Sequence, residues 1–147
     1  MRIIIDTNIA FSAILKTNSI FAQIILQPKS RFNFYSTDLL SIEIDEHKEK
    51  IKKIADYNDF ELNRTIKLIT SKIKFINANL IPPKILLDSQ RLLEDIDLDD
   101  AEFVALTTHI RDKLWSGDKE LQNGLKAKGW TKFITTDDIL KIANKKR

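Results

Sequence analysis

Four acidic residues occupy positions from which carboxylates of distant chain segments can meet. Asp6 comes directly after a short apolar run that is typical of a buried β-strand, and Asp118 comes just after a later predicted strand over 113–116. Asp100 lies in an acidic helix start, where the helix dipole favours an anion. Glu43 lies in a helix that follows a second strand. We therefore expect four carboxylates from four separate segments to converge.

Convergent carboxylates repel one another and are tolerated when a divalent cation neutralises them or when one is protonated. The chain has no cysteine, and neither of its two histidines adjoins these acids, so the expected ligands are all oxygen atoms. Oxygen ligands suit Mg²⁺ or Mn²⁺. Such an ion polarises a phosphoryl oxygen and activates water, which is the usual chemistry of phosphodiester hydrolysis.

Each acid also has a simpler structural explanation. An aspartate at a helix start is most often a cap, and this applies to Asp100, Asp118 and Asp137. Glu43 alone would most often be a solvated helix charge or the partner of a nearby lysine. Asp6 differs because a carboxylate that directly follows a buried isoleucine-rich strand is costly without a partner. A functional role is therefore the preferred interpretation for Asp6.

The elements that position these acids alternate between strands and helices. Apolar patterning predicts strands over 2–5, 32–36, 72–76, 113–116 and 133–135. It predicts helices over 19–27, from 37 or 38 to 54, over 58–71, as a short helix near 92–96, from the acidic run 97–100 to 110, over 119–127, and from 137 or 138 onward. This alternation predicts the α/β class, a three-layer α/β/α sandwich around a mostly parallel sheet. In such sheets ligands bind beyond the carboxyl ends of the strands.

Composition narrows the function classes. With 147 residues, 43% hydrophobic and 31% charged, the chain is expected to form one globular domain over 1–147. Its three glycines do not form a phosphate-binding fingerprint. No apolar run is long enough for a membrane span or a signal peptide, so we expect a cytoplasmic protein. Residues 126–147 carry a net charge of +5 within a total of +3, which suits a polyanionic partner or a solvated tail.

Four motifs together resemble the PIN domain family. They are Ile3-Ile4-Ile5-Asp6-Thr7-Asn8, Leu40-Ser41-Ile42-Glu43-Ile44, the acidic start of 97–106, and Trp115-Ser116-Gly117-Asp118-Lys119-Glu120-Leu121. Their order and approximate spacing agree with that family from residue 2 to about residue 143. Each motif is weak by itself, whereas four in the right order on the expected elements are fairly specific.

The resemblance implies a metal-dependent nuclease that acts on single-stranded RNA with Mg²⁺ or Mn²⁺. It assigns catalysis and metal binding to Asp6, Glu43, Asp100 and Asp118. It assigns supporting roles to Thr7, Asn8, Asp97 and Ser116, and Lys119 is expected to contact the RNA backbone. Many bacterial members are toxins of toxin–antitoxin pairs, so the resemblance implies an antitoxin protein as a partner besides RNA.

Neighbouring acids compete for two of these assignments. Asp97 and Asp99 compete with Asp100, and Glu46 competes with Glu43 on the same helix face. The spacing favours Asp100 because it precedes the apolar stripe that begins at Phe103 by three residues. Two other functions stay open: a non-catalytic RNA-binding module of the same fold, and a receiver-like regulatory domain with acids at the carboxyl edge of its sheet.

Several aromatic residues and histidines are interpreted as structural. Phe11, Phe21 and Ile24 are expected in the core, with an exposed apolar patch for a homodimer or a partner helix as the alternative. Trp115 is expected to pack in the core rather than to stack on a base. His47 is expected to be a surface residue.

Overall fold

The computed structural model describes residues 1–28 and 31–145; Lys146 and Arg147 of the basic C-terminal segment lie outside this part. Within it, five parallel strands form one sheet in the order β3-β2-β1-β4-β5. Their bounds are β1 Arg2–Ile5, β2 Asn33–Thr37, β3 Ile73–Ile76, β4 Lys113–Trp115 and β5 Phe133–Ile134. The sequence-based prediction of an α/β fold with a mostly parallel sheet is confirmed.

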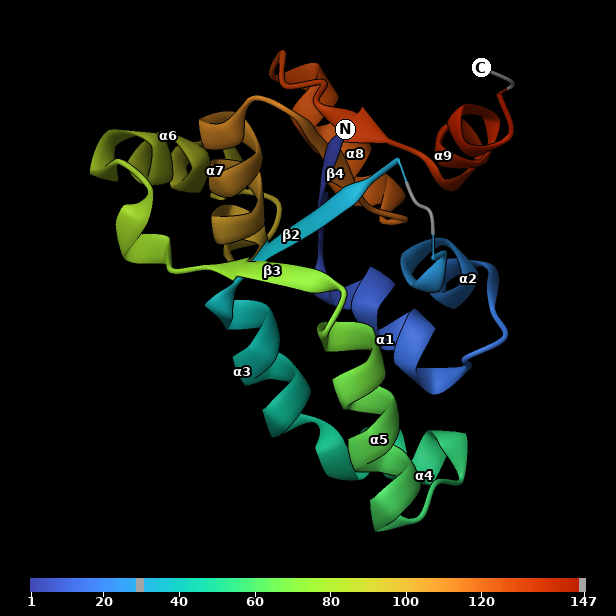
Figure 1. Ribbon diagram of the computed structural model, residues 1–147. Coiled ribbons are helices and arrows are strands. Elements are labelled where there is room, and N and C mark those ends of the chain that lie inside the picture. The colour runs from blue at the N-terminus through green and yellow to red at the C-terminus, as the bar shows by residue number, and fades with distance from the viewer. Residues whose placement is uncertain (29–30, 146–147) are drawn as a thin grey trace.

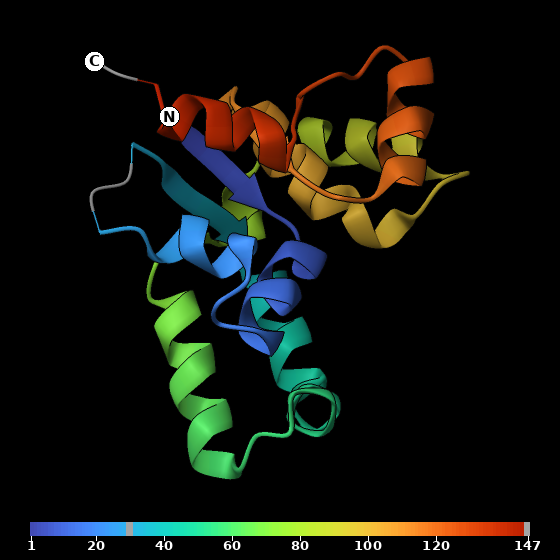
Figure 2. The ribbon, with the colours of Figure 1, turned by 90° about the vertical axis from the view of Figure 1, so that its right-hand side faces the viewer.

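Helices cover both faces of this sheet. Their bounds are α1 Thr7–Leu15, α2 Ile20–Leu26, α3 Asp38–Glu46, α4 Lys48–Ala55, α5 Asp59–Thr70, α6 Pro83–Leu93, α7 Ala101–Ile110, α8 Lys119–Ala127 and α9 Thr136–Ala143, with 3-10 turns η1 Ala78–Leu80 and η2 Leu98–Asp100. Helices α6 and α7 lie on one side of the sheet (Figure 1), and α1, α2 and α9 lie on the side that faces the viewer in Figure 2. Helices α3, α4 and α5 extend away from the sheet as an arm.

The core is built around the central strand β1. Ile3, Ile4 and Ile5 are fully buried because this strand has a neighbour on each edge and helices on each face. Trp115 at the end of β4 is also fully buried, and its ring lies near those of Phe21 and Phe34. The expected packing role of Trp115 is confirmed. The carboxyl end of β1 is thereby held firmly, which matters for the aspartate that follows it.

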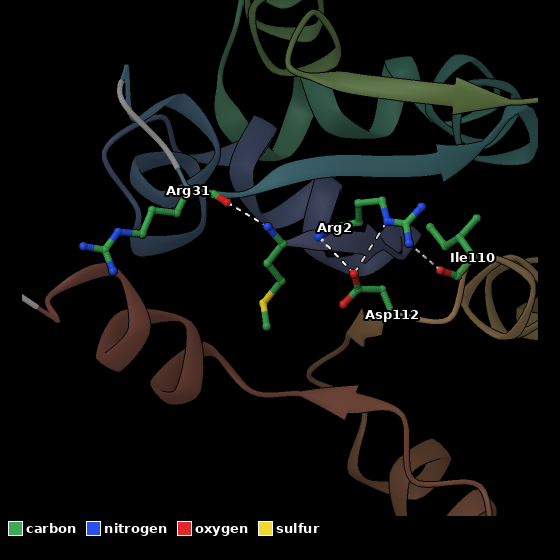
Figure 3. A network of polar contacts seen from close by, with 5 residues as sticks. Arg2, Arg31, Ile110 and Asp112 are labelled. Carbon is green, nitrogen blue, oxygen red and sulfur yellow. Dashed lines mark hydrogen bonds and ion pairs between the residues drawn. The ribbon is translucent and has the colours of Figure 1, made fainter. Parts of the chain in front are cut away.

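The amino ends of the strands are tied together at the opposite edge of the sheet (Figure 3). The Arg2 backbone N–H donates to the Asp112 carboxylate at 3.1 Å, and the Arg2 guanidinium donates to the Ile110 carbonyl at 2.9 Å. The N-terminal ammonium donates to the Arg31 carbonyl at 3.0 Å. These bonds join the starts of β1, β2 and β4 and leave the carboxyl edge for other groups.

Four predictions about local structure are wrong. The short helix expected near 92–96 is instead the longer helix α6, Pro83–Leu93, because proline is well suited to the first turn of a helix. No helix is predicted after Asp6, but α1 begins at Thr7, since Asp6 caps it. The helix expected from 37 or 38 to 54 is two helices, α3 and α4, which meet at His47. Asp100 does not lie in the first turn of α7: it ends the preceding 3-10 turn η2 and is the residue before the helix.

Among the described residues, no single helix is long and apolar enough to cross a membrane. Helices α1 and α2 reach the required length and composition only as a pair, which is bent by 99° where they join.

Candidate metal and catalytic site

A cavity of about 230 Å³ opens beyond the carboxyl ends of β1 and β4. All four predicted acids line it. The full lining is Asp6, Thr7, Asn8, Phe11, Glu43, His47, Asp97, Asp99, Asp100, Phe103 and Asp118. Strand order reverses between β1 and β4, since β2 and β3 lie on one side of β1 while β4 and β5 lie on the other. Crevices of this kind are the usual ligand sites of open α/β sheets.

Asp6 lies at the floor of this cavity and is 3% exposed. One carboxylate oxygen accepts a hydrogen bond from the Ile9 backbone N–H at 3.0 Å and so caps α1. Burial raises the pKa of Asp6, and the nearby Asp118 raises it further, while hydrogen bonds from Ile9, Ser116 and Asn8 lower it. Burial is the largest of these effects. A buried carboxylate whose pKa is raised is stabilised by a bound proton or by a nearby cation.

Asp118 reaches the cavity from the loop after β4. Its carboxylate accepts from the Leu121 N–H at 3.1 Å, which caps α8. Its own N–H donates to the Ser116 hydroxyl at 3.2 Å. Ser116 is buried and lies behind the cavity wall, where it connects Asp118 to Asp6. The cap and the serine together fix the direction of the Asp118 carboxylate.

Asp100 is a third acid of the cavity whose ionisation the fold disfavours. Its side chain forms no capping bond with α7, although it directly precedes that helix. Burial raises the pKa of Asp100 to about 7, with further contributions from Asp97, Asp6, Asp118 and Glu43. Because all four neighbours act on it through space, their carboxylates lie within electrostatic range of one another.

Glu43 completes the wall from α3 in the arm. Partial burial raises its pKa, as do Asp99 and Glu46, while Thr7 and His47 lower it. The Thr7 hydroxyl is buried and has no hydrogen-bond partner of ordinary geometry among the described residues. It lies close enough to Glu43 to lower the pKa of that carboxyl. An unsatisfied hydroxyl at an acidic cavity can donate to a carboxylate and accept from a bound water.

The structure shows which of the competing acids line the cavity and where Lys119 lies. Asp97 and Asp99 line the cavity but are exposed, and Asp97 caps η2 by accepting from the Asp99 N–H at 3.0 Å. Glu46 is exposed and does not line the cavity, whereas Glu43 does. Lys119 is exposed and lies outside the lining.

Three aromatic rings at the cavity were not predicted there. Phe11 was expected in the core and His47 on the surface, but both are half-buried and line the cavity. Phe103 lines it too, from the buried stripe of α7. Spacing carried a signal: His47 lies four residues after Glu43, and Phe11 four residues after Thr7, so each pair shares a helix face. The Thr7–Phe11 spacing has this meaning only within α1, which the sequence pattern does not predict as a helix.

The donor chemistry of the cavity fits a hard divalent cation. Its polar lining offers carboxylates and a hydroxyl, and the mutual repulsion that raises the pKa of Asp100 is what a cation would relieve. No three His, Asp or Glu side chains in the described ranges 1–28 and 31–145 are close enough to ligate one ion together. The arrangement therefore suits an ion held by fewer carboxylates directly, with the others reaching it through water.

Comparisons with known proteins agree with this architecture. A family model described as a PIN domain matches residues 4–140. No curated protein matches the chain. A solved chain from VapBC2 of Rickettsia felis, crystallised with a DNA fragment from its promoter, is similar in fold with a TM-score of 0.70. The two share 13% sequence identity, and the match covers 92% of this chain and 98% of that one.

Proposed function

Because this chain belongs to the PIN domain family, as its motifs predict, we propose that it is a metal-dependent endoribonuclease that hydrolyses phosphodiester bonds of single-stranded RNA. One observation carries the proposal: four carboxylates from separate segments line one cavity at the carboxyl edge of the sheet, and their repulsion helps to raise the pKa of Asp100 to about 7. Such an arrangement costs stability without a cation, so a catalytic role explains what a structural role does not.

Asp6, Glu43, Asp100 and Asp118 would hold Mg²⁺ or Mn²⁺ directly or through water. When bound, such an ion polarises a phosphoryl oxygen and activates water. Asp6 and Asp118 are held by their capping bonds and Ser116, so they position one side of the site rigidly. Asp100 has no capping bond, and its carboxyl is free to exchange a proton for the ion. Lys119, exposed directly after Asp118, would contact the RNA backbone.

Strand order argues against a receiver-like regulatory domain. The receiver and flavodoxin type of sheet has the order 2-1-3-4-5, whereas this sheet has the order β3-β2-β1-β4-β5. The non-catalytic RNA-binding module shares the fold, and only a cleavage assay separates it from a nuclease.

We further propose that the protein is the toxin of a toxin–antitoxin pair and has an antitoxin partner. The family resemblance supports this role, as does the likeness in fold to VapBC2, a complex that was crystallised on promoter DNA. Co-expression with a candidate antitoxin from the same genome, followed by affinity purification, tests whether a stable complex forms. Growth arrest by this chain alone, relieved by that partner, is the expected result.

The nuclease proposal is tested with labelled single-stranded RNAs incubated with Mg²⁺, with Mn²⁺ and with EDTA. Asp6→Asn and Asp100→Asn remove one charge each with little change in volume, and we expect each to lower cleavage at least about 100-fold. Asp137→Asn is the matched control, since Asp137 is an exposed acid in the first turn of α9. Cleavage that persists in EDTA or in both site variants would overturn the proposal, as would RNA binding without any cleavage.

A further inference from the structure

We propose that Phe11 and His47 form a base-binding subsite beside the acidic cavity, where a nucleobase next to the scissile phosphate packs against their rings. This inference rests on the proposed function, because it states how the same site recognises single-stranded RNA.

The two rings form a pair in the lining of the cavity, and Phe11 also packs against the edge of the core. Their centroids lie 5.5 Å apart and their planes are inclined by 57°, so together they form a corner of aromatic surface. Both residues are half-buried, and both line the cavity together with the four acids. Among the described residues, the other close ring pairs involve the core residues Trp115, Phe34 and Trp130, which do not line this cavity.

Hydrogen bonds hold the His47 ring in place. Its Nδ1 lies 2.8 Å from the Glu43 carbonyl oxygen, and its backbone N–H donates to the same oxygen at 3.1 Å. Because a carbonyl only accepts, Nδ1 carries the hydrogen of this bond. Within the described ranges, Nε2 has no hydrogen-bond partner, so it is left to bond to the edge of a base.

The chemistry of this corner suits a base rather than a phosphate. The acids repel the RNA backbone except where a cation stands between them, whereas the rings present flat aromatic surface without negative charge directly beside the acids. Aromatic side chains stack on any base, since every base has a π-face. When a phosphate reaches the acids, the base of that nucleotide is the flat group that can reach Phe11 and His47.

The test measures binding rather than cleavage. The reference protein is Asp100→Asn, which keeps the RNA intact in Mg²⁺, and the probe is a short fluorescein-labelled single-stranded RNA. Each base of the probe is replaced in turn by an abasic ribose, and dissociation constants are measured by fluorescence anisotropy. Phe11→Leu and His47→Gln are added singly to the reference. Phe60→Leu is the matched control, since Phe60 is 72% exposed on α5 and lies outside the cavity.

At one probe position, removal of the base should weaken binding to the reference about 5- to 150-fold. Phe11→Leu should weaken binding of the intact probe by a similar factor, and base removal should then cost almost nothing more. His47→Gln should partly reduce the loss of affinity that base removal causes, and Phe60→Leu should leave that loss unchanged. Thermal unfolding confirms that each variant is folded.

The subsite is wrong if base removal lowers the affinity of the folded Phe11→Leu and His47→Gln proteins as much as it lowers that of the reference. It is also wrong if base removal leaves the affinity of the reference unchanged at every position. The two proposals fail separately. Cleavage by the unmodified protein without this coupling overturns the subsite alone. Coupling in a protein that does not cleave RNA supports the subsite and overturns the nuclease.

Discussion

Asp100 lies in surroundings that disfavour its ionised form, and the same surroundings suit it to its proposed role in the site. The other helix-start acids of the site, Asp6 and Asp118, each accept a backbone N–H bond at one carboxylate oxygen. Asp100 lacks such a bond. Its burial, together with the like charges around it, raises its pKa to about 7. Near neutral pH this carboxyl is close to balance between a protonated form and an ionised form that binds a cation.

We expect the metal-free protein to lose stability as pH rises toward neutrality. Below about pH 4, Asp100 is protonated in both the folded and the unfolded protein, so it does not lower the free energy of unfolding. Between that pH and about pH 7, the unfolded chain releases the proton while the folded protein retains it, so stability falls and then levels off above the folded pKa. The largest possible loss in the free energy of unfolding is about 4 kcal/mol. Solvent screening at a half-buried carboxyl lowers this loss to about 1–2 kcal/mol.

Urea unfolding in EDTA at about pH 5 and about pH 8 measures this effect. Asp100→Asn removes the titrating group while Asp6 and Glu43 remain, so the variant should lose less stability over this interval than the unmodified protein. Equal losses in the two proteins would show that Asp100 titrates as an ordinary aspartate.

At the scale of elements, the same side chains both begin helices and furnish the site. Asp6 caps α1 and Asp118 caps α8, so each carboxylate is fixed relative to a strand end and a helix start. The arm brings its acid in another way: α3 places Glu43 at the cavity, and the break at His47 turns its ring toward Phe11 of α1. Short elements with well-defined ends therefore position this site.

The capping role of Asp118 and its proposed catalytic role can be separated by two substitutions. Asn keeps a side-chain oxygen for the Leu121 N–H, whereas Ala removes it, so Asp118→Ala should be less stable than Asp118→Asn by about 1 kcal/mol. Both should abolish RNA cleavage, because both remove the charge. Asn58→Ala is the control: it removes the cap of α5 at a similar cost in unfolding free energy and should leave cleavage unchanged. Equal stability of the two Asp118 variants would show that the cap contributes little.

At the scale of the molecule, the sheet brings together residues that are far apart in the chain. The order β3-β2-β1-β4-β5 places the ends of β1 and β4 side by side at the point where strand order reverses. Helices α6 and α7 lie on one face of the sheet and α1 and α2 on the other (Figures 1 and 2). The lining of the cavity combines residues of α1, α3 and α7 with residues that follow β1 and β4. An ion bound there would join four segments of the chain.

Mg²⁺ or Mn²⁺ should therefore stabilise the whole fold. A ligand that binds only the folded state at about 100 times its dissociation constant adds about 2.7 kcal/mol to the free energy of unfolding. Differential scanning fluorimetry at increasing metal concentration should show the corresponding rise in melting temperature for the unmodified protein and for Asp137→Asn. The rise should be lost in Asp6→Asn/Asp100→Asn. The same response in that double variant would place the ion elsewhere.

The sequence by itself determined which residue types are available for chemistry, and it determined most of the elements. The lack of cysteine and the presence of Asp6 and Asp118 after predicted strands already predicted an oxygen-lined site at the carboxyl edge of a parallel sheet. These features are readable because side-chain type and local periodicity act over a few residues. The five strands and most helices lie close to their predicted ranges for the same reason.

Only the tertiary structure decided which residues meet. Strand order made β1 and β4 neighbours, and packing left Asp100 half-buried among four other acids while Glu46 stayed outside. Packing of α1 against the arm brought Phe11 and His47 together although 36 positions separate them in the sequence. Such contacts depend on strand pairing and helix packing across the whole chain, which no local pattern of residue types specifies.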